Sequence, residues 1–185
     1  RAGASSYLAK PVEPGRLIDL LDTLTCRHPT QPYRVLMVDD DPLLLKTHAH
    51  FLRASGMEVQ TLSQPLQILD VLNEFNPDVV VLDVYMPGAS GPELAAVLRQ
   101  RDVYLHLPIL FLSAEADTSQ QLLALNLGGD GFLVKPVQPA HLVSAVTARA
   151  QRARQNAAIR QRLHTTLYER EREHLALDHH AIVSI

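Results

Sequence analysis

Five short apolar runs, each followed by a longer helix-like pattern, constrain this chain more than any other feature of its sequence. They lie between Arg34 and Val137 and are rich in branched residues. Such alternation is typical of a parallel sheet with helices packed against it. The runs are Arg34–Asp39, Met57–Leu62, Asp78–Val84, Pro108–Ser113 and Gly131–Lys135. We therefore expect an α/β domain built from five βα units.

The composition of each run predicts its place in the sheet. The first, third and fourth runs are apolar nearly throughout, as strands covered on both faces must be. The second run alternates between apolar and polar residues, which is typical of an edge strand. The helix starts are marked by Pro42 after Asp41, by Pro65, by Pro92, and by Asp117–Thr118.

A segment near the N-terminus repeats the last of these units. Residues 3–17 (GASSYLAKPVEPGRL) match residues 128–142 (GGDGFLVKPVQPAHL) at a constant offset of 125 residues. We interpret residues 1–25 as the C-terminal remnant of a preceding domain of the same kind. The alternative is that two unrelated strand-to-helix corners converged on Lys-Pro. Residues 26–33, polar with two prolines, are then a linker, and residues 34–150 form the complete domain.

The helical pattern after Pro139 continues without Gly or Pro past Arg172, which is longer than one βα unit needs. We interpret residues 151–174 as a helical signalling linker. Their apolar positions keep no heptad register, so the pattern leaves a homodimer open without predicting one. Residues 175–185 resemble the start of a PAS sensory domain, and the alternative is a helix end with an apolar tip.

Composition narrows the classes of function. A formal net charge of −3 and a pI near 6.3 argue against nucleic-acid binding. No run approaches the roughly 20 apolar residues of a membrane span, and no signal peptide is recognisable. The single cysteine, Cys26, cannot form an internal disulfide, which fits a reducing compartment. We expect a cytoplasmic fragment that binds neither membrane nor nucleic acid, with its nine histidines at the surface.

Polar side chains stand at the carboxyl ends of four of the five runs. Asp39–Asp41 follow the first run and Asp83 lies near the end of the third, while Ser113 and Lys135 close the fourth and fifth. The carboxyl ends of parallel strands share one rim, so these side chains should converge. Clustered carboxylates repel one another unless a hard cation such as Mg²⁺ neutralises them. With the metal shielding it, Asp83 can attack a phosphorus atom while Ser113 and Lys135 contact the transferred oxygens.

This set of residues resembles the response regulator receiver family of two-component signalling, from Arg34 to the helix after Pro139. The matching motifs are RVLMVDD, VVVLDVYMPGASG, ILFLSA and FLVKP. The resemblance implies a flavodoxin-like, doubly wound, five-stranded parallel sheet in the order 2-1-3-4-5, here with a long C-terminal helix. It also implies that a histidine kinase or a phosphotransfer protein phosphorylates Asp83.

The resemblance assigns the metal ligands as well. Mg²⁺ would be bound directly by Asp40 and Asp83, through water by Asp39, and by the backbone carbonyl of Tyr85. Asp41 would then cap the first helix.

The remaining positions of the family's site concern the phosphate and the switch. Ser113 and Lys135 would bind the phosphoryl group and assist its transfer to Asp83. Ser113 and Phe132 would change position on phosphorylation, and Phe132 lacks the hydroxyl group that many relatives carry here.

Two other functions are compatible with parts of the pattern. Haloacid dehalogenase enzymes also use Mg²⁺ and two aspartates spaced like Asp39 and Asp41, but Leu43 stands where their motif has Thr or Val. A degenerate receiver that serves as a dimerisation platform would not need every chemical position filled. We therefore expect a phosphoacceptor domain that catalyses only its own aspartyl phosphorylation and dephosphorylation. Its C-terminal helix would regulate an output such as a PAS module followed by a histidine kinase or diguanylate cyclase.

Overall fold

The computed structural model describes residues 31–114 and 126–181, with side chains described through residue 168. The chain divides into two units, Arg1–Pro32 and Tyr33–Ile185, and the described fold belongs to the second. The predicted remnant at residues 1–25 and the helix start at Asp117–Thr118 lie outside the described residues.

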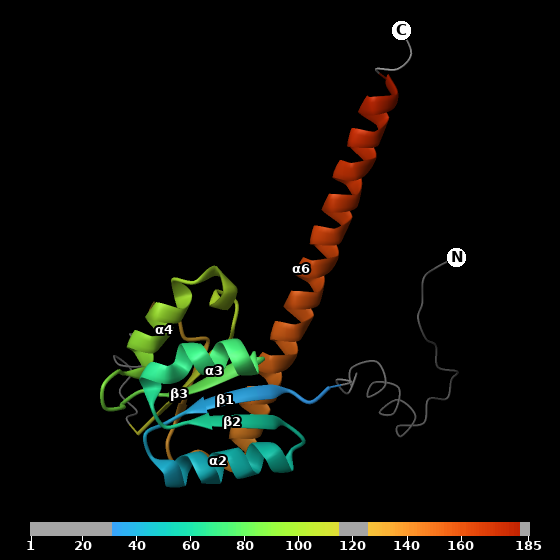
Figure 1. Cartoon of the computed structure of the whole chain (residues 1–185). Helices are drawn as coiled ribbons and strands as arrows, with labels where there is room; N and C mark the ends of the chain where they lie inside the picture. The colour runs from blue at the N-terminus through green and yellow to red at the C-terminus, as the bar shows by residue number, and fades with distance from the viewer. Residues whose placement is uncertain (1–30, 115–125, 182–185) are drawn as a thin grey trace, which may run out of the picture. The chain divides into compact units, whose positions relative to one another are not determined.

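Five parallel strands form one sheet in the order β2-β1-β3-β4-β5, which confirms the predicted topology (Figure 1). The three central strands are almost completely buried, whereas the edge strand β2 has buried, half-buried and exposed residues without strict alternation. The strands are β1 (Arg34–Val38), β2 (Glu58–Leu62), β3 (Val79–Asp83), β4 (Ile109–Ser113) and β5 (Gly131–Val134).

The helices begin at or close to the predicted signals. Asp41 caps α2 (Pro42–Ala54) by accepting the N–H groups of Leu43 and Leu44. Ser90 and Glu93 form a reciprocal capping box at α4 (Gly91–Arg99), followed by the 3₁₀ turn η2 (Asp102–Tyr104).

The helix expected at Pro65 begins differently. A 3₁₀ turn, η1 (Pro65–Gln67), comes first, and α3 (Ile68–Phe75) follows it. Neither Gln64 nor Gln67 caps its element with a side-chain hydrogen bond, so no strong signal in the sequence fixes where the regular helix begins.

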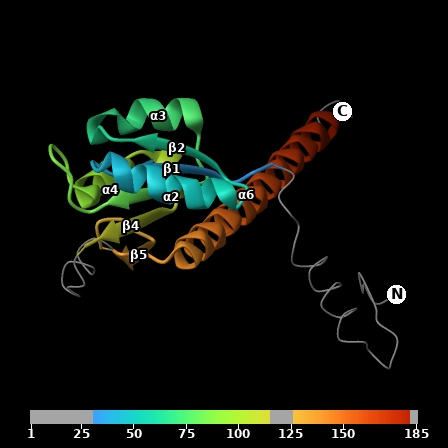
Figure 2. The same cartoon turned by 90° about the horizontal axis from the view of Figure 1, so that it is seen from below.

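Helices cover both faces of the sheet (Figure 2). Successive residues of a strand point to opposite faces, so each central strand contributes to two hydrophobic clusters. One cluster joins β1, β3 and β4 to Ile68 and Leu72 of α3 and to Leu98 of α4. The other joins the opposite sides of these strands to α2 and to the first turns of α6 (Pro139–Ala181).

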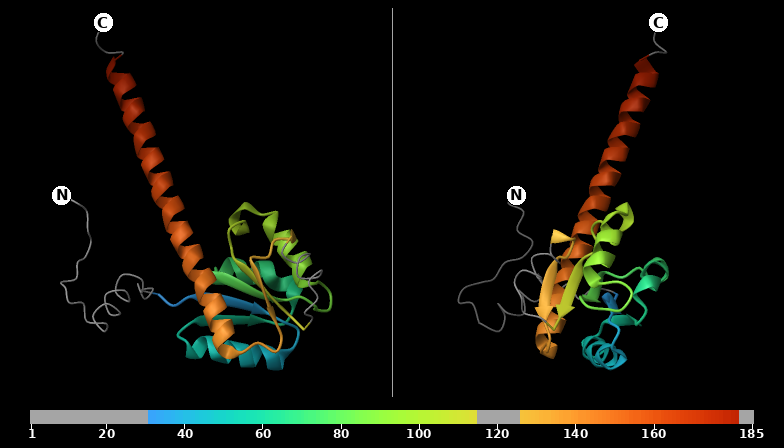
Figure 3. Two further views of the ribbon diagram at one scale, coloured as in Figure 1. Left: turned by 180° about the vertical axis from the view of Figure 1, so that it is seen from behind. Right: turned by 90° about the vertical axis from the view of Figure 1, so that its left-hand side faces the viewer.

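The long C-terminal helix is confirmed as a single element of 43 residues. Its first part lies against the sheet, where Leu142, Val146 and Ala150 are fully buried (Figure 3). From Gln155 to Tyr168 every side chain is exposed, because the helix has left the sheet behind. In the part of the chain that is described, no helix combines the length and apolar character needed to cross a membrane.

Candidate functional site

The strand register brings the predicted polar residues to one edge of the sheet. Val38 lies opposite Leu82 on the neighbouring strand, so Asp39 and Asp83 both follow this pair directly. Ser113 closes β4 beside Val134 of β5, and Lys135 comes next along the chain. All four positions therefore meet at the carboxyl ends of the parallel strands, as the sequence predicted.

Three carboxylates form a cluster at this edge. One oxygen from each of Asp39, Asp40 and Asp83 lies within 4.8 Å of the other two. Asp39 and Asp83 are buried, with 2% and 6% of their surfaces exposed, whereas Asp40 is open to solvent. Buried carboxylates at this separation repel one another, so the cluster requires positive charge.

Lys135 supplies part of that charge. Its Nζ donates hydrogen bonds to Asp39 Oδ2 and to Asp83 Oδ1, each at 2.7 Å. Its ammonium therefore connects two strand ends that are far apart in sequence. The backbone N–H of Lys135 also donates to the carbonyl of Ser113 at 2.7 Å, which ties the lysine to β4.

Burial and charge oppose each other in setting the pKa values of this site. Burial raises the pKa of Asp83 above its ordinary value, although the hydrogen bond and charge of Lys135 act in the opposite direction. Burial alone would lower the pKa of Lys135, but the hydrogen bonds and charges of Asp39 and Asp83 outweigh it and raise that pKa. The ammonium is thus held in its charged form between the two carboxylates.

The other predicted residues surround this cluster at different depths. Ser113 is buried, with 1% of its surface exposed. Phe132 lies opposite Phe111 in the sheet and is partly buried against the cluster under α3 and α4. Tyr85, two residues beyond β3, has 47% of its surface exposed. Ser113 and Phe132 thus lie on adjacent strands, two residues apart in register, while the side chain of Tyr85 lies at the rim.

Gly91 is a site residue that sequence reasoning missed. A Cβ at this position would lie 2.2 Å from the carbonyl oxygen of Asp83, so no larger residue fits without a shift of the backbone. The N–H of Gly91 donates to the carbonyl of Val84 at 3.0 Å, which closes the loop after β3. The Ser-Gly-Pro-Glu sequence predicts the helix start, but it does not predict that Gly91 lies against the carbonyl of Asp83.

His48 corrects one expectation, because it is buried rather than at the surface. Only 6% of its surface is exposed, and its Nδ1 is buried without a hydrogen-bond partner among the described residues. It lies on the inner face of α2 with Leu45 and Leu52. The spacing of His48 from Leu45 and Leu52, three and four residues, is the signal in the sequence that could have shown this.

The donor set suits a hard divalent cation. Mg²⁺ prefers oxygen ligands, and three carboxylates reach a common point here. Both oxygens of Asp39 already accept protein hydrogen bonds, Oδ1 from the N–H of Asp41 and Oδ2 from Lys135. The carboxylate of Asp40 is exposed and does not accept such a pair of hydrogen bonds among the described residues. Asp40 and Asp83 are therefore better placed than Asp39 to bind a metal directly.

Comparison with known proteins agrees with this geometry. The response regulator receiver domain family matches residues 35–147 of the chain. The chain belongs to this family. Receiver domains are signalling domains of two-component systems that interact with histidine kinases or phosphotransfer proteins, and they generally depend on Mg²⁺.

Curated relatives are considerably longer than the present chain. RcaC of Microchaete diplosiphon is 38% identical over 154 residues, which are 83% of this chain and 24% of that protein. An uncharacterised 76.5 kDa protein of Thiocystis violacea is 41% identical over 154 residues, or 83% of this chain and 22% of that protein. The DNA-binding response regulator MtrA of Mycolicibacterium smegmatis is 37% identical, covering 66% and 53% of the two chains.

Solved structures show the same receiver architecture. A putative response regulator from Chloroflexus aurantiacus is 31% identical with a TM-score of 0.63, covering 65% of this chain and 99% of that one. The chemotaxis response regulator CheY4 of Vibrio cholerae is 29% identical with a TM-score of 0.61, covering 64% and 99%. Both solved structures are matched over nearly their whole length, whereas about two thirds of the present chain is covered.

Proposed function

We propose that this chain is a phosphorylatable switch in which Asp83 accepts a phosphoryl group from a histidine kinase or a phosphotransfer protein. The observation that carries the proposal is the position of Asp83. Its carboxylate is buried at the edge of the sheet, within 4.8 Å of two other carboxylates and 2.7 Å from the ammonium of Lys135. A buried cluster of carboxylates costs stability, and charged clusters of this kind are concentrated at functional sites.

The transfer is a direct displacement at phosphorus. A carboxylate oxygen of Asp83 forms the new P–O bond while the bond from phosphorus to the donor breaks, and the donor leaves with the electron pair. Ser113 and Lys135 would bind the transferred oxygens through a hydroxyl group and an ammonium group. Lys135 is already within hydrogen-bond distance of the nucleophile, so little rearrangement is needed.

The carboxylate cluster and the loop after β3 would hold the metal. Asp40 and Asp83 would be direct ligands, Asp39 a ligand through water, and the backbone carbonyl of Tyr85 the remaining protein ligand. Mg²⁺ bound there would supply the positive charge that lets an anionic phosphoryl donor approach an anionic site.

The signal would then pass from the site to α6. Phosphorylation would draw Ser113 toward the phosphoryl group and let the ring of Phe132 move inward. Three residues, 136–138, separate Lys135 from the start of α6, so a change at the end of β5 lies close to the helix. We assign residues 151–174 as the signalling linker to a downstream module, with residues 175–185 as the start of a PAS domain.

The remaining assignments extend this proposal. Residues 1–25 would be the end of a preceding receiver domain, followed by the linker at residues 26–33. Three exposed apolar residues of α6, Ile159, Leu163 and Leu167, would provide the contact if the chain forms a homodimer. The protein would act in the cytoplasm.

The haloacid dehalogenase alternative is disfavoured by Asp41. In that reading, Asp41 would be the second aspartate of the motif and would belong to the active site. Here the carboxylate of Asp41 accepts the N–H groups of Leu43 and Leu44 at 2.8 and 3.2 Å and caps α2. The side chain of Asp41 therefore caps the helix and is not a member of the acidic cluster.

Incubation with acetyl phosphate and Mg²⁺, followed by intact-mass measurement, tests the proposed function. We expect one added phosphoryl group in the wild type, none in Asp83→Asn, and a slower reaction in Asp40→Ala. Asp41→Asn is the matched control, since asparagine also caps helices, and it should react normally. Normal phosphorylation of Asp83→Asn, or of the wild type in EDTA, would contradict the assignment.

A further inference from the structure

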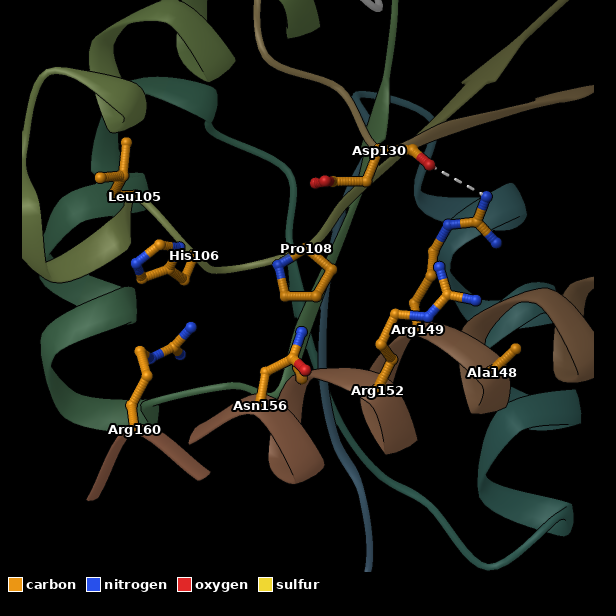
Figure 4. Close-up of a pocket in the computed structure, with 10 residues that line it drawn as sticks. Leu105, His106, Pro108, Asp130, Ala148, Arg149, Arg152, Asn156 and Arg160 are labelled. Carbon is orange, nitrogen blue, oxygen red and sulfur yellow. Dashed lines mark hydrogen bonds between the residues drawn. The ribbon is translucent and has the colours of Figure 1, made fainter. Parts of the chain in front are cut away.

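A polar pocket of about 370 Å³ lies at the edge of the sheet opposite the carboxylate cluster. It is formed between α6 and the two segments that lead into β4 and β5 (Figure 4). Pro108 directly precedes β4 and Asp130 directly precedes β5, so the pocket belongs to the amino ends of these strands. The proposed phosphorylation site does not use any of its residues.

Three of the ten residues that line this pocket are arginines. Arg149, Arg152 and Arg160 project from one stripe of α6, together with Asn156, at spacings of three and four residues. In Figure 4, Arg149 and Arg152 lie on one side of the pocket, and Arg160 lies with His106 on the other. Three guanidinium groups around one small volume stand out in a chain whose formal net charge is −3.

The one carboxylate in the lining is already engaged elsewhere. Oδ2 of Asp130 accepts hydrogen bonds from Arg99 and from the N–H of Ile109, both at 2.8 Å. Arg99 therefore balances the charge of Asp130. In the described parts of the chain, no ion pair neutralises Arg152 or Arg160, so the pocket keeps a surplus of positive charge.

Arg149 is held in place without an ionic partner. Its guanidinium donates only to the backbone carbonyls of Ala145 and Asp130, at 3.1 and 3.2 Å, and its Nε is buried without a partner among the described residues. The absence of a side chain at Gly131 makes room for this group, since a Cβ there would lie 1.8 Å from the terminal nitrogen of Arg149. The guanidinium is therefore fixed by the backbone rather than by an acidic side chain, and its positive charge is not cancelled by an ion pair among the described residues.

The size and composition of the pocket indicate the class of ligand. Its volume falls within the range of small-molecule sites. Planar guanidinium groups match phosphate oxygens in charge and geometry. Leu105, Pro108, Ala148 and Ala153 add apolar surface for an uncharged part of the ligand.

We propose that this pocket binds a small phosphate-bearing organic molecule of nucleotide type, through Arg149, Arg152 and Arg160. The ligand would bridge α6 and the body of the domain at the point where the helix leaves the sheet. It would therefore stabilise the packing of α6 against the domain, whether or not Asp83 is phosphorylated. An acidic protein segment is less suitable, because cations on two sides of a small concavity favour a compact polyanion.

Calorimetric titration of the full chain with ATP, pyrophosphate and adenosine, in buffer containing EDTA, tests this proposal. EDTA keeps divalent cations away from the carboxylate cluster. We expect saturable one-to-one binding of ATP and pyrophosphate, and none of adenosine. Arg152→Gln and Arg160→Gln should each weaken ATP binding by about tenfold, as loss of one charged contact does. Both side chains are exposed, so the variants should fold normally.

Arg162→Gln is the matched control. Arg162 is exposed on the same helix but lies two residues beyond Arg160, on the opposite side of α6. Its substitution, like Asp83→Asn, should leave ATP binding unchanged. Absence of saturable binding of ATP and pyrophosphate would overturn the proposal. So would an equal loss in Arg162→Gln, which would indicate general charge attraction, or tighter binding of a hexaglutamate peptide than of pyrophosphate.

Discussion

Lys135 shows how a single residue can hold a repulsive site together. Its ammonium makes two hydrogen bonds of 2.7 Å to carboxylates that end different strands. Without the ammonium of Lys135, the buried carboxylates of Asp39 and Asp83 would have no positively charged side chain between them. The same ammonium is placed to bind a phosphoryl group, so its structural and its proposed chemical roles coincide.

Replacing Lys135 with methionine should therefore reduce stability. Two buried carboxylate oxygens lose their donor, which costs about 1–3 kcal/mol of unfolding free energy. Mg²⁺ should restore more of this loss in Lys135→Met than it adds to the wild type, because the metal replaces the missing charge. Urea denaturation with and without Mg²⁺ measures both effects, and Lys46→Met at an exposed position of α2 is the control. Equal effects of Mg²⁺ on both proteins would contradict the idea.

His48 gives the domain a dependence on pH at the level of one side chain. Burial lowers the pKa of His48 below its ordinary value of 6.5, and the charge of Lys135 lowers it further, while Asp39 acts in the opposite direction. The unfolded chain thus binds a proton more readily than the folded chain does. The contribution of His48 to stability is complete above pH 6.5 and declines as the pH falls from there toward the lowered pKa.

The loss of stability between pH 7.5 and 5.5 should accordingly be smaller in His48→Gln than in the wild type. Urea denaturation at the two pH values measures the difference. His50→Gln, at an exposed position of the same helix, should behave like the wild type. An identical pH dependence in His48→Gln and the wild type would show that His48 does not take up the proton.

At the scale of elements, Arg154 ties α6 to the sheet, in addition to apolar packing and the hydrogen bond from Arg149 to the carbonyl of Asp130. Arg154 donates from two nitrogens to the two oxygens of Asp78, at 2.7 and 2.5 Å, and its guanidinium lies 4.6 Å from the ring of Tyr33. Asp78 also accepts the N–H of Arg34 at 2.8 Å. This contact joins α6, the start of β3 and the start of β1.

Arg154→Lys should loosen this junction. Lysine cannot make the paired hydrogen bonds, so we expect a loss of about 1 kcal/mol in unfolding free energy. Amide hydrogen exchange in residues 151–160 should also become faster, because the hydrogen bonds that join this part of α6 to Asp78 are weakened. Arg162→Lys serves as the control at an exposed position. Unchanged exchange in Arg154→Lys would mean that the Arg154–Asp78 contact does not hold this part of α6 on the sheet.

The elements of this fold could be predicted wherever a local pattern decides them. The apolar runs located the strands, and Asp41 and Ser90 marked helix starts that the structure contains. The convergence of Asp39, Asp83 and Lys135 followed from parallel strands sharing one edge. The roles of His48 and Arg149 depend on which side of each helix meets the sheet. Apolar spacing indicates that side, but the groups that each side chain meets there are set by tertiary packing, which a short sequence pattern does not contain.

At the scale of the whole molecule, the described domain carries opposite charges at the two edges of its sheet. The carboxylate cluster lies at the carboxyl ends of the strands, and the arginine pocket lies at their amino ends. α6 begins four residues after Lys135 and passes the arginine pocket before it leaves the sheet. The helix is therefore the element through which both proposed sites would act on anything that follows it.

If α6 carries the signal through its rotational phase, insertions beyond the pocket should reveal it. Two residues inserted after Arg162 rotate the following helix by roughly 200°, whereas seven residues rotate it by only about 20° from its original phase. Both variants should accept a phosphoryl group on Asp83 at the normal rate, since the receiver body is untouched. In the longer protein we assign to this chain, the two-residue insertion should abolish control of the output by phosphorylation, while the seven-residue insertion should preserve it. Intact-mass measurement and an assay of the downstream module check the two halves of this prediction. Equal control of the output in both variants would mean that α6 connects the modules as a passive tether.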